Sequence, residues 1–307
     1  MIVNPTKSQL LKGYICLLIT CTVWGLTWVV SKLAVKELNP LQVAAMRQTI
    51  AGGLLVAYFS FAKKVPLPTK KQFLWLLLLG VLMFVVSNGM STVAVQYIPS
   101  GTAALISALY PLIVLILQRV FFGVKNFSPL TLVGVVLGFA GILLVFYENA
   151  FVGKSDHFFT GIGLSFLAIT GWSFGSIFLA RNKQEIHPYY GAGWQMVLSS
   201  IILWIAVFSS KSYVAMSAIP MPTWGYIFML ALGGSLLAYV AFIYSLKVLS
   251  PAIASLYAYV NPLIAMVAAA FMILEPLTAK MVWGAIVTLA GVFIVNYSIK
   301  KNQASAL

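Results

Sequence analysis

The sequence predicts an all-α membrane protein of ten transmembrane helices, arranged as two inverted five-helix repeats. Three observations lead to this fold class: the share of apolar residues, the length of the apolar segments, and an internal repeat. Hydrophobic residues make up 62% of the 307 residues and charged residues only 8%, whereas soluble domains are roughly 45–50% apolar. A chain with so much apolar surface requires lipid as its solvent.

Ten segments are long and apolar enough to cross a bilayer, which takes roughly 20 residues of helix. The alternating polarity of membrane β-strands is absent from the sequence. No cleavage pattern of small residues follows the first segment, so we expect a retained span and not a signal peptide. The predicted spans are 14–35, 41–61, 73–97, 101–122, 129–147, 160–180, 189–210, 222–246, 252–274 and 278–298.

The second half of the sequence repeats features of the first half. Residues 1–150 and 151–307 are therefore predicted to be two five-helix repeats within one membrane body. Because five is odd, the second repeat enters the membrane from the opposite side, as in many secondary transporters. At shifts of 148 to 151 positions the matched pairs are Gly13 and Gly161, Trp24 and Trp172, Glu37 and Glu185, Pro40 and Pro188, Pro111 and Pro262, Gly134 and Gly284, Gly141 and Gly291, and Tyr147 and Tyr297.

Basic residues are divided unevenly between the two ends of the predicted spans. With a cytoplasmic N-terminus, thirteen fall inside and five outside, which is the bias of the positive-inside rule. Both termini are therefore expected in the cytoplasm, and the net charge of +14 indicates membrane orientation instead of nucleic-acid binding. The inner set is Lys7, Lys12, Lys63, Lys64, Lys70, Lys71, Arg119, Lys125, Arg181, Lys183, Lys247, Lys300 and Lys301, and the outer set is Lys32, Lys36, Lys154, Lys211 and Lys280.

Pro111 and Pro262 occupy matching places in the fourth and ninth predicted spans. Proline lacks a backbone N–H and clashes with the carbonyl four residues earlier, so each is expected to interrupt its helix. Carbonyls freed at membrane depth are tolerated where they face protein or a wet cavity. Paired interruptions indicate a central binding site and hinges for a two-state motion. The alternative is a pair of purely structural kinks.

Several stretches together resemble the drug/metabolite transporter superfamily of the EamA type. They are "VWGLTWVVSK" in the first span, "LNPLQVAAMRQ" at the second, "ALYPLIVLI" in the fourth, and "LEPLTAKMVWGAIVTLAGVFIV" leading into the last. The sequence departs from the family pattern where "FFGVKNFSPL" lacks the acid that Glu275 supplies in the second half, and where Leu274 replaces a glycine.

The resemblance implies a multi-pass carrier of the bacterial cytoplasmic (inner) membrane that exports amino acids or related metabolites. It also implies a cavity lined by spans one, three, four, six, eight and nine, with the fifth and tenth spans to one side. An uptake carrier for a sugar, a nucleobase or another small solute is the alternative function on the same fold.

Aromatic and polar residues within the spans are the candidates for contacting substrate. Trp24 and Trp172 lie about midway along their spans, whereas interfacial tryptophans lie near helix ends, and Trp28 shares a helix face with Trp24. Buried polar groups must find hydrogen bonds, so they could hold a polar solute. For each candidate the alternative is contact with a neighbouring helix. The polar candidates are Asn88, Tyr110, Ser176, Gln195, Tyr239, Tyr257 and Asn261.

Two charged residues raise separate hypotheses. Arg47 lies about six residues into the second span, where its repeat-related residue is Gln195. A guanidinium binds a carboxylate with two parallel hydrogen bonds, so Arg47 could bind an acidic group of the substrate; the alternative is a structural role. Glu275 could sense protons, or it could serve as a cap or loop contact at the start of the tenth span.

Other classes of function are disfavoured by what the sequence lacks. Its two histidines, His157 and His187, fall in predicted loops, and no cluster of acids, histidines or cysteines indicates an enzyme. No phosphate-binding loop and no channel filter sequence is present. We therefore expect no cofactor and no metal.

The expected partners are a small-molecule substrate and the lipid bilayer, with the chain a monomer or weak homodimer. Gly134, Gly138 and Gly141 form a small-residue face on the fifth span, which favours close packing of helices. We expect that packing to occur within the monomer.

Overall fold

The computed structural model describes residues 6–123, 128–152, 157–181, 185–249, 253 and 256–304. Over these residues the regular elements are helices, and no strand is present. The all-α prediction is therefore confirmed. In chain order the helices are α1 (Lys7–Glu37), α2 (Pro40–Ala57), η1 (Tyr58–Ala62), α3 (Lys70–Gly80), η2 (Val81–Gly89), α4 (Met90–Tyr97), α5 (Ser100–Ser107), α6 (Tyr110–Phe122), α7 (Pro129–Val152), α8 (Phe158–Arg181), α9 (Pro188–Ser209), η3 (Met216–Ala218), α10 (Met221–Phe228), η4 (Met229–Leu237), α11 (Ala238–Val248), α13 (Tyr257–Ile273) and α14 (Ala279–Ala304).

Polar side chains fix where several helices begin. Thr6 and Gln9 form a reciprocal capping box at the start of α1, and Thr69 and Gln72 form the same motif at α3. The Asn39 side chain accepts from the first backbone N–H groups of α2. These caps satisfy donors that a helix start leaves without partners, so they end the polar loops and begin the apolar helices at defined residues.

Six continuous helices or helix series are long and apolar enough to cross a membrane. The pair α5 and α6, bent by 42° at the break between them, makes a seventh if it is counted as one span. Helices also lie at the remaining predicted ranges 41–61, 129–147 and 252–274. Among the described residues the apolar helices at 129–147 and 252–274 are too short for this criterion, and α2 with its 18 residues does not meet the criterion as a whole. The chain is thus a multi-pass helical membrane protein, and the count of ten spans stays a prediction.

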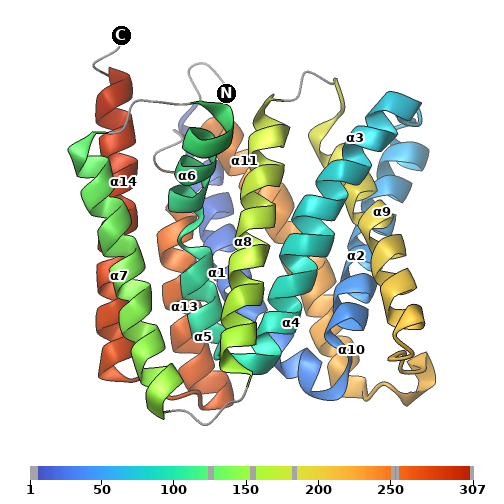
Figure 1. Ribbon diagram of the computed structural model, residues 1–307. Helices are drawn as coiled ribbons and strands as arrows, with labels where there is room; N and C mark the ends of the chain where they lie inside the picture. Colours follow the sequence, from blue (N-terminus) through green and yellow to red (C-terminus); the bar gives the residue numbers. More distant parts are fainter. Residues whose placement is uncertain are drawn as a thin grey trace.

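The helices run alongside one another as one bundle, with the start of α1 and the end of α14 at the same end (Figure 1). The α7 helix packs along α14 at one side of the bundle, and α2 packs along α9 at the opposite side (Figure 1). Each of these pairs joins one helix from the first half of the chain to one helix from the second.

Glycines bring α7 and α14 into close contact. A methyl group on Gly134 would lie 2.8 Å from the Gly291 carbonyl oxygen, and one on Gly141 would lie 2.6 Å from the Gly284 carbonyl oxygen. The two helices are therefore antiparallel, because the lower residue number of one meets the higher number of the other. The glycine face of the fifth predicted span is used for packing within the chain, as the sequence predicts.

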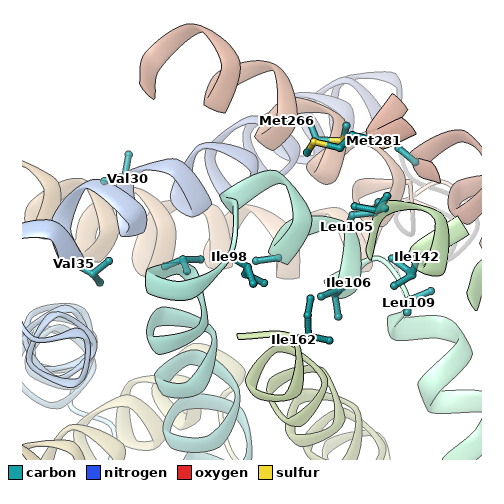
Figure 2. Close-up of a cluster of buried hydrophobic side chains, with 14 of the residues drawn as sticks. Val30, Val35, Ile98, Leu105, Ile106, Leu109, Ile142, Ile162, Met266 and Met281 are labelled. Carbon is teal, nitrogen blue, oxygen red and sulfur yellow. The ribbon is translucent and has the colours of Figure 1, made fainter. Parts of the chain in front are cut away.

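The largest apolar core surrounds α5, which is buried from Ser100 to Ile106. Leu105, Ile106 and Leu109 are each no more than 1% exposed. Figure 2 shows these residues among side chains from α1, α7, α8, α13 and α14. Because so many helices pack on α5, a displacement of α5 would require the side chains of these neighbouring helices to repack.

Two nine-residue π-helical segments, η2 and η4, interrupt otherwise α-helical series. Their first residues, Val81 and Met229, are 148 positions apart, and so are their last, Gly89 and Leu237. The irregularity therefore recurs at the same place in both halves. Inserted π turns shift the helix register locally and are frequent at functional sites.

The two prolines differ in their surroundings. Pro111 is the second residue of α6, directly after the bend that separates α5 from α6, so the interruption predicted there is confirmed. Pro262 lies inside α13, which continues from Tyr257 to Ile273. This proline lies five residues after the start of the helix, where it removes one backbone hydrogen bond, and its role as a hinge stays a prediction.

The α13 helix ends at Leu274, which has a left-handed backbone with φ of 55°. Only glycine adopts this conformation at little cost. The conformation therefore favours glycine at this position, and this chain accepts a leucine there at a cost of about 1–2 kcal/mol.

Candidate functional site

A central cavity of about 180 Å³ lies between helices of both halves of the chain. Its walls come from α1, α2, η2, α4, α5, α6, α8, α9, η4, α11 and α13, whereas α7 and α14 contribute nothing to the described lining. The lining predicted for spans one, three, four, six, eight and nine is present, with Arg47 and Met196 added from the second and seventh. Nine of the eleven predicted binding residues line the cavity: Trp24, Trp28, Arg47, Asn88, Tyr110, Trp172, Tyr239, Tyr257 and Asn261.

Repeat-related residues meet at this cavity. Five pairs at shifts of 148 or 151 positions have both members in the lining. Each half of the chain thus presents the same set of helix positions to one common space. The pairs are Trp24 and Trp172, Ser87 and Ser235, Ser91 and Tyr239, Ser107 and Ala258, and Tyr110 and Asn261.

The two prolines act on this lining through the residues around them. Ser107 and Ala258 stand four residues before Pro111 and Pro262, so their carbonyls lose the donor that a helix would supply. Both residues line the cavity. Tyr110 and Asn261, the residues directly before the prolines, line it as well.

Hydrogen bonds to the second half of the chain orient the tryptophans of α1. Trp24 donates from Nε1 to the Gly234 carbonyl oxygen over 2.9 Å, and Trp28 donates from Nε1 to Asn261 Oδ1 over 3.2 Å. The Trp24 ring also packs edge-on against Tyr257, with ring centroids 5.4 Å apart. With their polar atoms engaged, both indoles present apolar surface to the cavity.

Arg47 is 9% exposed and lines the cavity. Its Nε donates to Ser235 Oγ over 2.7 Å. Gly234 makes room for the guanidinium, since a methyl group there would lie 3.1 Å from an Arg47 Nη atom. The Ser235 hydroxyl thus holds the guanidinium against the π-helical segment η4, and Gly234 leaves room for it because it has no side chain.

Asn88 lies in the other π-helical segment, η2. Its Oδ1 accepts from Gln48 Nε2 over 3.0 Å, and its backbone carbonyl accepts from the Ser91 and Thr92 hydroxyls over 3.0 and 2.8 Å. Two side-chain hydroxyls from α4 thus donate to a backbone carbonyl of the π-helical segment. Within the described part of the chain the Asn88 amide nitrogen donates no hydrogen bond, and the residue lines the cavity.

Ser176 and Gln195 do not line the cavity. Ser176 interacts with the Tyr110 hydroxyl and is not itself part of the described lining. Gln195 is 3% exposed, and its backbone carbonyl packs against Gly80 of α3. Its side-chain Oε1 is buried and has no hydrogen-bond partner among the described residues.

The sequence reasoning missed the small hydroxyl residues of the wall. Some of them donate to carbonyls of their own helices, as Thr27 does to Trp24 over 2.7 Å. Ser87 and Ser235 are separated by the same 148 positions as the two central tryptophans, and this spacing was the signal that could have identified them. The missed residues are Thr27, Ser31, Ser87, Ser91, Thr92, Ser107, Ser165 and Ser235.

Glu275 links three segments at the end of the bundle where α5 begins. Its carboxylate accepts from the Ser100 backbone N–H over 2.9 Å and from the Ser100 hydroxyl over 2.9 Å, and it pairs with Lys32 over 3.6 Å. Lys32 also donates to the Ile98 carbonyl oxygen over 2.7 Å. The acid therefore caps the start of α5, within the fourth predicted span.

The described lining contains one cation and no acid or histidine. No group of three or more metal-ligating side chains occurs within the described ranges of the chain. The described cavity is therefore an aromatic and hydroxyl-lined space with a single positive charge. Small-molecule sites are commonly built in this way, from apolar and aromatic side chains with a few placed polar groups.

Known proteins match this chain over most of its length. The model of the EamA-like transporter family matches residues 11–147 and again residues 159–297. The uncharacterized inner membrane transporter YedA of Escherichia coli (strain K12) is 35% identical over 260 residues, which cover 84% of this chain and 81% of that one. The uncharacterized transporter YvbV of Bacillus subtilis (strain 168) is 25% identical over 307 residues, or 98% of this chain and 95% of that one.

A solved crystal structure of a protein also has the same fold. It superposes with a TM-score of 0.64 at 16% identity, over 94% of this chain and 98% of that one.

Proposed function

Because the chain belongs to the EamA-like transporter family, we propose that it is a secondary carrier that moves small metabolites across the cytoplasmic membrane by alternating access. The observation that carries this proposal is the cavity shared by both halves of the chain, with five repeat-related pairs in its wall. Its volume of about 180 Å³ is below the roughly 300–1,000 Å³ of pockets for drug-sized ligands. A solute about as large as one amino acid fits this space.

The packing of the two halves supports ten spans in two inverted five-helix repeats. The α7 and α14 helices are repeat-related, and so are α2 and α9, and each packs on its own relative. Gly134 meets Gly291 while Gly284 meets Gly141. Such reciprocal contacts are typical of a two-fold axis, and antiparallel helices place that axis in the membrane plane. Exchange of shape between two such halves opens the cavity to each side in turn.

We place both termini in the cytoplasm of a bacterial cell, in its inner membrane. The start of α1 and the end of α14 lie at one end of the bundle (Figure 1), together with the lysines at the start of α3 and the end of η1. A basic surface at that end is what the positive-inside rule requires of the cytoplasmic side.

The proposed substrates are amino acids or related compounds, and the proposed direction is export. The mixture of indole faces, hydroxyls and one guanidinium suits a solute with both an apolar and a polar part. Uptake of a sugar, a nucleobase or another small solute is the alternative on the same fold.

Counterflow in proteoliposomes tests the carrier proposal. Vesicles preloaded with one unlabelled amino acid should accumulate the same labelled amino acid transiently and with saturation, for at least one member of a panel of amino acids, purines and sugars. A channel gives no counterflow, and failure across the whole panel would contradict the proposal.

Two tryptophan variants test the site. Trp172→Ala should reduce the flux at least tenfold, because it removes an apolar wall of the cavity. Trp283→Ala removes the same side chain from α14, where it is 61% exposed, and should leave the flux near wild type. Equal fluxes for the two variants would show that the cavity is not the transport site.

A further inference from the structure

We propose that Arg47 binds the carboxylate of the substrate, so that the transported solutes carry a carboxylate group beside a small apolar body. This inference rests on the carrier function proposed above and names the substrate class of the same cavity.

The Arg47 guanidinium has no acidic partner within the described residues. Of the five acids in the sequence, the structure describes the side chains of three. Glu275 pairs with Lys32, and Glu37 and Glu185 are exposed. Glu37 is the last residue of α1 and lies close in sequence to α2, but among the described residues it forms no ion pair with Arg47. A charge buried without a counter-ion is costly, so the free cavity favours an anion.

The guanidinium also keeps hydrogen-bond donors free for a ligand. Arginine has five N–H donors in a planar fork. Ser235 Oγ takes the one on Nε, and no other hydrogen bond from Arg47 is present among the described residues. The Nη groups at the cavity wall match the geometry of a carboxylate, which accepts two parallel bonds.

The surrounding residues hold the fork in place. Ser235 anchors Nε, and Gly234 leaves space beside Nη that a side chain would fill. Both belong to the π-helical segment η4. A preorganised donor loses less conformational entropy on binding than a mobile lysine does.

The second repeat shows that the fold does not require this charge. Gln195 stands at the position equivalent to Arg47, and it does not line the cavity. The wall therefore has a cationic side in one half only. The rest of it is formed by indole faces and aliphatic side chains such as Ile169 and Met83, which favour an apolar body on the ligand.

A matched ligand series tests this assignment by calorimetry on the purified full chain. The probes are isocaproate, its neutral amide isocaproamide, and L-leucine, which share one carbon skeleton. Isocaproate and leucine should bind roughly tenfold to a hundredfold more tightly than isocaproamide, the range expected for a hydrogen-bonded charge. Equal affinity of isocaproate and isocaproamide, or no binding of either carboxylate, would overturn the inference.

The variants locate the effect. Arg47→Gln should abolish the preference for carboxylate over amide, Arg47→Lys should restore part of it, and Ser235→Ala should weaken carboxylate binding several-fold. Lys36→Gln, which removes an exposed charge from α1, should bind all three probes as the wild type does. A carboxylate preference that persists in folded Arg47→Gln would overturn the inference. If that variant does not fold, the wild-type series and Ser235→Ala still decide.

This test fails independently of the carrier proposal. If counterflow of a neutral solute is seen and the carboxylate preference is not, the carrier stands and the assignment of Arg47 falls. If a carboxylate binds through Arg47 and no counterflow occurs, the binding site stands and the transport function falls.

Discussion

Lys32 and Glu275 form an ion pair over 3.6 Å, with exposed fractions of 20% and 13% for their side chains. The pair joins the last turns of α1 to the segment that follows α13, and Glu275 also caps the start of α5. Ser31, the neighbour of Lys32, lines the cavity. The ion pair thus lies next to the cavity, at the end of the bundle opposite the start of α1 and the end of α14, where a contact between α1, α5 and the segment after α13 would close that end.

Loss of this contact should open the cavity toward the outside. Glu275→Gln removes the charge that holds Lys32 and weakens the cap on α5, because a carboxylate is the stronger acceptor at a helix start. We expect several-fold faster labelling of Cys introduced by Ser31→Cys with an impermeant thiol reagent, in a background lacking Cys16 and Cys21.

Glu37→Gln is the matched control, because Glu37 is exposed at the same end of the bundle. It should not change the labelling rate. An unchanged rate in Glu275→Gln would mean that the ion pair does not close this end. If the same variant instead abolished a proton-driven flux, Glu275 would be a proton sensor, the other role predicted from the sequence.

The proline pair should matter more for transport than for expression. Pro111→Ala supplies a backbone N–H that can bond the Ser107 carbonyl, and Pro262→Ala supplies one for the Ala258 carbonyl. Each added bond straightens or stiffens its own helix at the cavity wall. We expect flux per molecule to fall at least several-fold, with Pro111→Ala the more severe because a 42° bend lies beside it.

Pro188→Ala is the control for these variants, since Pro188 is exposed at the first turn of α9, where proline is readily replaced. Flux is measured in proteoliposomes and normalised to inserted protein. Normal flux in both cavity-side variants would make the prolines merely structural.

Contact between α7 and α14 should be sensitive to one added methyl group. Gly141→Ala places a methyl against the Gly284 carbonyl and the Thr288 backbone, and overpacking of this kind costs about 1–3 kcal/mol. A thermal unfolding assay in detergent should show a lower melting temperature. Gly163→Ala has open space around its methyl group and should be neutral or slightly stabilising, because alanine favours helix over glycine. Equal melting temperatures would contradict close packing here.

Orientation can be measured with single cysteines in a background lacking the native two. Lys7→Cys and Lys301→Cys should resist an impermeant thiol reagent in intact cells, because the basic end of the bundle faces the cytoplasm. Lys211→Cys, in the exposed loop between α9 and η3, should react. Labelling of the first two would reverse the orientation.

Helix positions were predictable because apolar length is a strong and local signal. The predicted range 160–180 corresponds to α8 (Phe158–Arg181), and 189–210 corresponds to α9 (Pro188–Ser209). The cavity tryptophans were predictable for a similar reason, since their mid-span position and their repetition are visible in the sequence.

The parts that could not be predicted depend on contacts between distant residues. The π-helical segments are stabilised by hydroxyls and by packing across the bundle, which periodicity does not reveal. Gln195 was grouped with the cavity residues because it matches Arg47 in the repeat, but only Arg47 lines the described cavity. The partner of Glu275 is likewise 175 positions away at Ser100, outside any local pattern.

The glycine contacts between α7 and α14 also have a consequence for biosynthesis. Gly284 is made 150 positions after Gly134, so α7 enters the membrane long before its partner helix exists. During that interval its glycine face meets lipid, where a groove of small residues packs poorly, or it meets the α7 of a neighbouring nascent chain. The interval ends when α14 is inserted. A pause of the ribosome, or a chaperone that shields α7 within the membrane, would therefore affect the yield of folded protein most during this interval.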